Sequence, residues 1–231
     1  IVQASTGPSH FLPSVSLAPD IDAALKASLE DAIPRFGSVV YLGNGGADEA
    51  RSDFYIRAVA SGTSSVNLQL YHRESGILIG TDQVPGGVDA DTLAEHISRI
   101  TSRFLPVGGV MYAFLESEGR LNPLTRCMVL SSAYFNNQSE ARHLAAYTCF
   151  EDLLEKDVES ALVHANLASL TVEVVTDGYV YPADVDLADA VAHGRRGVEL
   201  APGSAPAHRS LARALQVFGE TEAALASIRQ A

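Results

Sequence analysis

The chain has 231 residues, 47% of them hydrophobic, which is enough for one large domain or two smaller packed cores. Its formal net charge of −12 would repel phosphate backbones, so we expect no direct nucleic-acid binding by this fragment. No apolar run approaches the length of a membrane helix, and no signal peptide is recognisable. Because the chain begins at Ile1 and ends within a helical pattern, we expect a fragment of a longer protein.

The first half contains short β-rich runs separated by turn residues and framed by two amphipathic helices. The predicted strands are 15–18, 38–42, 53–60, 65–71 and 77–84. Of the two predicted helices, the first covers 23–33 and stops at Pro34, and the second begins after its cap Asp89 and ends before Pro106. Alternation of Val66, Leu68 and Leu70 with polar neighbours predicts a sheet with one covered face and one wetter face. The order β-α-β-β-β-β-α indicates a small layer domain over residues 1–107. Residues 108–122 are expected to connect the halves, and 109–121 fit either an edge strand or a joining helix.

The second half, residues 123–231, has the spacing of stacked helical hairpins. In the last of these, Leu211 and Leu215 lie in a first helix, Phe218-Gly219-Glu220 make the turn, and Ala224 and Ile228 follow at helical spacing. Two more hairpins are expected upstream, one over 122–136 and 139–156, the other around Leu167-Ala168 and 190–197. This pattern resembles tetratricopeptide repeats, and three hairpins, the last cut short, suffice for a continuous core. The predicted fold class is therefore α+β.

The second hairpin carries an insertion, 175–186, which Gly178 and Pro182 are expected to keep out of any helix. It holds a group of acidic and aromatic side chains that are candidate partner-binding residues: Asp177, Tyr179, Tyr181 and Asp184. Tyrosine favours interface cores because it joins a large apolar ring to a polar hydroxyl. The alternative is a spacer loop whose tyrosines pack back onto the helices.

The only two cysteines, Cys127 and Cys149, fall in the two helices of the first hairpin at similar distances from its turn near Asn137. Antiparallel helices joined by a tight turn bring such positions alongside one another, so a disulfide can form. Two buried thiols that act as small apolar residues are the alternative. The residue pattern alone leaves both open.

Motifs for catalysis, cofactors or metals are missing from the sequence, so we expect a protein that is not an enzyme and carries no cofactor or metal. The glycine-rich run 43–46 is predicted to be a turn because Asp48 would repel a phosphate. No two histidines lie three or four residues apart, which excludes a metal site on one helix face but not one assembled across helices. His164 and His208 occupy equivalent positions in successive hairpins; packing explains them, and pH sensing is the alternative.

The first half resembles the TolB-amino-terminal-like domain. The resemblance is carried by Leu25, Leu29 and Ile33-Pro34-Arg35-Phe36 in the first helix and its exit, and by 66–70 with 75–79 in the central hairpin. The opening, 14–19, departs from that family's usual apolar strand ending in Pro-Phe. Together the two halves resemble the periplasmic region of ToxR-like and CadC-like membrane-bound transcriptional regulators. Cysteines recur in the first hairpin of such relatives, which favours the Cys127–Cys149 bond.

The resemblance implies a sensory region on the periplasmic side of the inner membrane. It would bind a protein, a peptide or a small-molecule signal, would be tethered through a membrane helix upstream of Ile1, and would signal to a DNA-binding domain outside this chain. Homodimerisation stays open. The alternative is a cytoplasmic tetratricopeptide scaffold of a signalling protein, such as one linked to a nucleotide cyclase, with both cysteines reduced.

Overall fold

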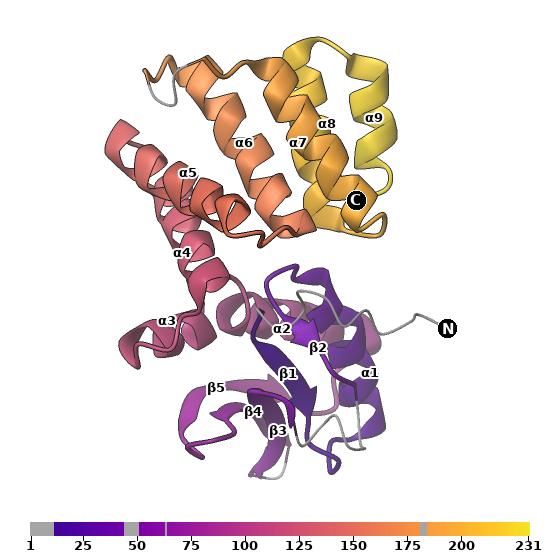
Figure 1. Ribbon diagram of the computed structural model, residues 1–231. Coiled ribbons are helices and arrows are strands. Elements are labelled where there is room, and N and C mark those ends of the chain that lie inside the picture. The colour runs from indigo at the N-terminus through magenta and orange to yellow at the C-terminus, as the bar shows by residue number, and fades with distance from the viewer. Residues whose placement is uncertain (1–11, 44–50, 63, 181–183) are drawn as a thin grey trace. The chain divides into compact units, whose positions relative to one another are not determined.

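The computed structural model describes residues 12–43, 51–62, 64–180 and 184–231 (Figure 1). Within these ranges the chain forms two compact units, Leu12–Leu121 and Asn122–Ala231. The first is a mixed α/β unit and the second is helical, so the predicted α+β layout is confirmed at this level. No helix of the described residues combines the length and apolarity that crossing a bilayer requires.

The α/β unit is built on one five-stranded sheet in the order β2-β1-β3-β4-β5. Its strands are β1 (Ser14–Leu17), β2 (Val40–Tyr41), β3 (Phe54–Ser61), β4 (Ser65–His72) and β5 (Leu78–Pro85). β1 pairs in parallel with β2 and β3, whereas β3, β4 and β5 pair antiparallel through two hairpins. All five predicted strands are present, but the second shrinks from the expected 38–42 to two residues. The glycine-rich turn predicted at 43–46 lies outside the described residues after Gly43.

Three helices complete this unit: α1 (Ala23–Ala32), α2 (Ala90–Phe104) and α3 (Val110–Ser117). The side chains of Asp22 and Asp89 accept hydrogen bonds from backbone amides in the first turns of α1 and α2, which explains where these helices begin. The short 3-10 helix η2 (Ile33–Arg35) follows α1 and contains Pro34, where the predicted helix stops. The segment left open between edge strand and helix forms α3, which packs against β5 and α2.

The two faces of the sheet differ as the alternation in β4 predicts. Leu68 and Leu70 are fully buried with Phe54 and Ile56 of β3. On the opposite face Tyr55 and Tyr71 are partly exposed and stack with ring centroids 5.1 Å apart. One face of the sheet is therefore covered and the other wetter.

The helical unit contains α4 (Pro123–Asn136), α5 (Glu140–Glu155), α6 (Ala161–Asp177), α7 (Leu187–Leu200), α8 (Ala205–Phe218) and α9 (Thr221–Ile228). Consecutive helices pack against each other along the chain, and α6 also packs against α8 (Figure 1). Several of these helices are capped at the amino end by a side chain that accepts a hydrogen bond from a backbone N–H group; the capping residues include Asn122, Ser139, Ser160 and Ser204. In the described part of this unit, these helices fall in the three predicted hairpins.

The insertion begins later than predicted. Residues 175–177 belong to α6, so Asp177 is helical instead of part of a loop. The helix ends at Gly178, whose φ of 71° is the left-handed conformation that glycine adopts without steric cost. The predicted start of the insertion was wrong by three residues. None of Val175, Thr176 and Asp177 breaks a helix, and Gly178 is the first residue that does.

Candidate functional site

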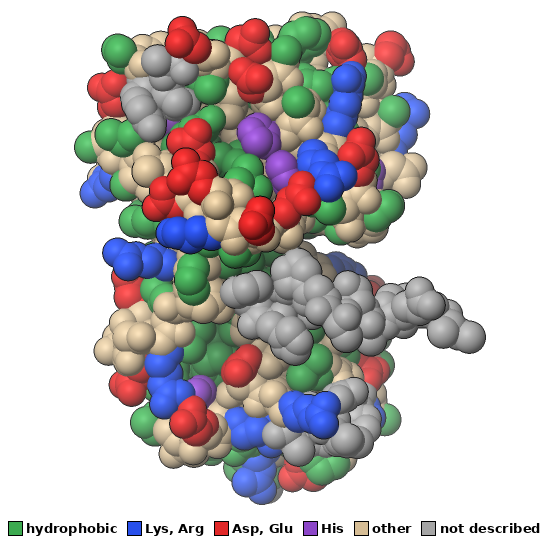
Figure 2. All heavy atoms as spheres, viewed as in Figure 1, with side chains coloured by type: hydrophobic (Ala, Val, Ile, Leu, Met, Phe, Trp, Pro, Cys, Tyr) green, Lys and Arg blue, Asp and Glu red, His purple; other side chains and the backbone are tan. Residues whose placement is uncertain are grey.

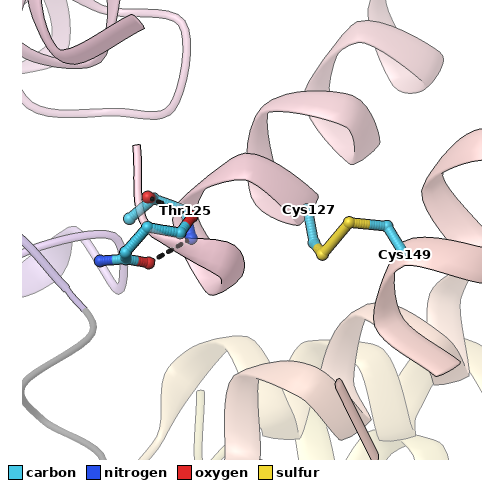
Figure 3. The surroundings of a disulfide bond; sticks show 4 residues. Thr125, Cys127 and Cys149 are labelled. Atoms are coloured by element: carbon cyan, nitrogen blue, oxygen red, sulfur yellow. Dashed lines mark hydrogen bonds between the residues drawn. A yellow bond between two sulfur atoms is a disulfide. The ribbon is translucent and has the colours of Figure 1, made fainter. Parts of the chain in front are cut away.

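Cys127 on α4 and Cys149 on α5 form a disulfide with a Cα–Cα distance of 5.4 Å (Figure 3). Figure 3 shows the two side chains meeting between the helices, with Thr125 in the first turn of α4. The Cys127 side chain is buried, at 1% exposure. Of the two arrangements left open by the sequence, the structure contains the bonded one, which ties together the two helices of the first hairpin.

A shallow groove runs over α4, α6 and α8, with a cavity volume of about 480 Å³. Its lining residues are Phe135, Ala165, Asn166, Ser169, Pro206, Arg209, Ser210 and Arg213. Ser131 donates a hydrogen bond to Asn166 Oδ1 at 2.9 Å, and the Ser169 and Ser210 hydroxyls lie 3.1 Å apart. These contacts link α4 to α6 and α6 to α8, so the polar floor of the groove is positioned by side chains from all three helices.

The two arginines of the groove lie one helical turn apart on α8 and have different surroundings. Arg213 forms an ion pair with Glu173 of α6, a carboxylate that is only 4% exposed. Burial raises the pKa of Glu173, and the guanidinium of Arg213 opposes this shift. The Arg209 side chain is exposed and has no hydrogen bond or ion pair among the described residues. Arg209 is therefore free to meet an anionic group that enters the groove.

Tyr179 packs back onto the first hairpin. Its hydroxyl lies 3.4 Å from that of Tyr134, which also donates a hydrogen bond to Asp177 Oδ2 at 3.2 Å. The Tyr179 ring contacts the ring of His143 at a centroid distance of 5.0 Å. Asp184 is exposed with a φ of 66°, and Tyr181 lies outside the described residues. The structure thus brings Asp177 and Tyr179 together, and Tyr179 makes the contacts of the packing alternative.

The two candidate pH-sensing histidines have separate surroundings. His208 Nε2 donates to the Pro202 carbonyl at 2.8 Å, and its Nδ1 lies 3.3 Å from Ser227 Oγ. His164 contacts His193 and Glu159 instead. Each is the fourth residue of its helix, α6 or α8, which agrees with their equivalent positions in the sequence. They do not form one site.

Three histidines of the helical unit, two buried and one half-buried, have lowered pKa values. Burial is the main cause for His143, His164 and His193; at His164 the carboxylate of Glu159 opposes it, and at His193 the neighbouring His164 adds to it. Hydrogen bonds from the guanidinium of Arg196 and from the imidazole of His164 lower the pKa of Glu159 to about 2. These histidines are therefore predominantly neutral at pH 7.

Lowering the pH from 7.5 to 5 is expected to destabilise the helical unit. A histidine whose folded-state pKa is depressed contributes stability that is complete above its unfolded pKa of about 6.5 and is lost as the pH falls towards the folded value. The raised pKa of Glu173 acts in the opposite direction. Thermal unfolding of the wild type and of His143→Gln at several pH values measures the contribution of His143 to this pH dependence. The contributions of the other titratable groups cancel when the two proteins are compared. A smaller pH dependence in the variant is expected, and an identical one would contradict the assignment.

Sequence reasoning missed the groove arginines Arg209 and Arg213, the buried Glu173, and His193 as the partner of His164. The available signal for Arg209 and Arg213 was their spacing of four residues, which places both on one helix face. Glu173 is flanked on both sides by valines, Val172 and Val174, which marks it as a charge in a mainly apolar stretch of α6 that needs a partner. No group of three or more histidine, cysteine or acidic side chains within the described ranges is arranged to hold a metal ion. Comparison with protein-family models and with curated proteins yields no match to this chain.

Proposed function

We propose that the helical unit is a non-catalytic, tetratricopeptide-like binding module whose groove holds an acidic segment of a peptide or protein partner. The observation that carries the proposal is Arg209, an exposed cation at the groove with no partner among the described residues, in a chain of net charge −12. Arg213 lies one turn further along α8, where one side of its guanidinium is held by Glu173. A carboxylate in the groove would meet both guanidinium groups.

The arrangement of the helices supports this proposal. The described residues that line the groove all belong to α4, α6 and α8, the first helix of each successive hairpin. The contact of α6 with α8 as well as with α7 is typical of tetratricopeptide arrays, in which the first helices line a concave face that binds extended peptides. Phe135 and Pro206 add apolar surface beside the arginines. Such a groove offers contact area and charge instead of a reactive centre.

We further propose that the chain is the sensory region of a bacterial membrane-bound regulator, with the α/β unit as a TolB-like domain. The Cys127–Cys149 bond favours an oxidising compartment such as the periplasm. Binding in the groove would then be signalled to a DNA-binding domain outside this chain.

An array of ten-residue peptides tests the groove directly. Each acidic peptide, rich in Asp and Glu, is paired with its Asn and Gln counterpart, and fluorescently labelled wild-type protein is compared with Arg209→Ala. We expect the labelled wild-type protein to bind a subset of the acidic peptides and not to bind their neutral counterparts. Loss of one charge-assisted hydrogen bond should weaken these interactions by roughly tenfold in Arg209→Ala.

The matched control is Arg229→Ala, which removes the same charge from an exposed position at the end of α9, away from the groove lining. Arg229→Ala should bind the same acidic peptides as strongly as the wild type does, since this variant changes the net charge of the protein but not the groove. Equal weakening in both variants would indicate unspecific attraction, and an array without any acidic preference would overturn the proposal.

A further inference from the structure

Two histidines from different helices meet in the second hairpin, outside the groove lining. His164 of α6 and His193 of α7 lie with their Nδ1 atoms 2.9 Å apart and their ring centroids at 5.1 Å. His164 is 7% exposed and His193 is partly exposed. Figure 2 shows histidine atoms reaching the surface of the helical half among acidic and basic groups. The pair is therefore reachable from solvent on the His193 side.

The contacts of His164 determine which nitrogen carries its proton. Its Nε2 lies 3.1 Å from Glu159 Oε1, and because a carboxylate can only accept, Nε2 carries the hydrogen. The Nδ1 lone pair of His164 then accepts the Nδ1–H of His193. Glu159 is itself held by Arg196, whose Nε and Nη2 donate at 2.7 and 3.1 Å. A carboxylate on one imidazole nitrogen, with the other left as an acceptor, is the arrangement that orients histidine ligands in metal sites.

We propose that His164 and His193 bind a divalent transition-metal ion of the Cu²⁺, Ni²⁺ or Zn²⁺ class through their Nδ1 atoms. Two metal–nitrogen bonds of about 2.0–2.1 Å at a tetrahedral angle place the nitrogens roughly 3.3–3.4 Å apart. The observed separation of 2.9 Å would have to open by only a few tenths of an ångström. His193 changes tautomer, with its hydrogen moving from Nδ1 to Nε2, so that the ion replaces one bridging hydrogen and no net proton is released.

The surroundings decide how tightly such an ion is held. Glu159 beside His164 and Asp189 one turn before His193 favour a cation, whereas Arg196 opposes it. Burial keeps both imidazoles neutral near pH 7, so their lone pairs are available to the metal. No third protein ligand adjoins the pair in the part of the chain that the structure describes. Water therefore completes the coordination, and the site binds an exchangeable ion instead of a permanent structural one.

The chemistry of the two ligands also predicts the order of metals. Imidazole nitrogen suits copper, nickel and zinc, whereas Mg²⁺ and Ca²⁺ prefer oxygen ligands. Cu²⁺ should bind most tightly, as the general stability order of divalent ions requires. An ion held by both rings connects α6 to α7, and because the unfolded chain holds these histidines far apart, metal binding should raise the unfolding temperature.

The test uses the untagged full chain with its disulfide intact, titrated at pH 7.5 with CuCl₂, NiCl₂, ZnCl₂ or MgCl₂ after treatment with a chelator. Calorimetry should give one site per chain for the transition metals. At a hundredfold excess over the dissociation constant, the unfolding midpoint should rise by roughly 5 °C or more. MgCl₂ should have no effect, and the shift produced by the transition metals should become smaller as the pH is lowered, because protons compete with the metal for the same nitrogens.

Two variants distinguish the pair from unspecific binding to surface histidines. His193→Gln keeps a side-chain amide that can donate to His164 but removes one metal ligand, so the midpoint shift should be lost. His96→Ala also removes one histidine, from α2 in the other unit, and should leave the shift unchanged. The chelated proteins provide the stability baseline for each variant. A wild type without metal response, or an equal response in His193→Gln, would overturn the proposal.

Discussion

Replacing both cysteines, C127A with C149A, is expected to lower the free energy of unfolding of the helical unit by about 3 kcal/mol. The bond closes a loop with a sequence separation of 22 residues, and in the chain-entropy model a loop of this size restricts the unfolded state by about that amount. Urea unfolding monitored by circular dichroism measures the loss. Because the Cys127 side chain is buried and Cys149 is half-buried, we expect the folded chain to resist reduction until it opens.

The reductant provides the control for this prediction. Reduction of the wild type should reproduce the loss, and the double variant should not respond to it. An equally stable double variant would show that the bond contributes nothing. Intact mass under non-reducing conditions is an independent measurement: a native chain isolated with two hydrogens more than the bonded form would favour the cytoplasmic scaffold over the periplasmic sensor.

Gly194→Ala is expected to destabilise the helical unit by about 1–3 kcal/mol, the usual cost of overpacking a core. In an exposed helix the same change stabilises by up to about 1 kcal/mol, because alanine is the better helix former. Here the added Cβ would lie 2.8 Å from Leu211 Cα, a backbone atom of α8 that can only yield by moving the helix. Thermal unfolding measures the effect, and the sign of the change separates packing from helix propensity.

Gly203→Ala is the matched control, since an added Cβ there meets nothing within 4 Å and the backbone needs no positive φ. That variant should unfold within about 0.5 kcal/mol of the wild type. Because α8 carries Arg209 and Arg213, displacement of this helix by Gly194→Ala should also weaken acidic-peptide binding. A stabilised Gly194→Ala chain would mean that α7 and α8 do not pack as closely as described.

The boundaries of most elements were predictable from short-range signals. Asp89 begins α2, because its side chain accepts a hydrogen bond from a backbone amide in the first turn. Gly178 ends α6 by a similarly local effect, although the end of this helix was expected three residues earlier. Alternation in β4 indicated which side chains are buried. Elements without a local signal were predicted less well. Residues 109–121 fitted both a strand and a helix, because Gly109 offers no side chain that could cap a helix there. The structure forms the helix α3 in this segment.

The functional residues were harder to predict because their partners are distant in sequence. His193 meets His164 across 29 positions, and Glu173 meets Arg213 across 40. Which side chains face each other depends on how far one helix is rotated against the next, and one residue changes that direction by about 100°. The cysteines were a partial exception, because their similar distances from one tight turn indicated that the two side chains could face each other.

Most of the order of elements, the cap of α2 by Asp89 and the acidic charge followed from the amino-acid sequence alone, because each depends on chemistry within a few residues or on simple sums. The sequence also indicated that Cys127 and Cys149 could lie close together, but it left open whether they are bonded. Three features were decided only by the tertiary structure: the groove over α4, α6 and α8, the lack of a partner for Arg209 among the described residues, and the contact of His164 with His193. They arise where separate helices pack, and the rotation and spacing of packed helices are determined by all the side chains between them.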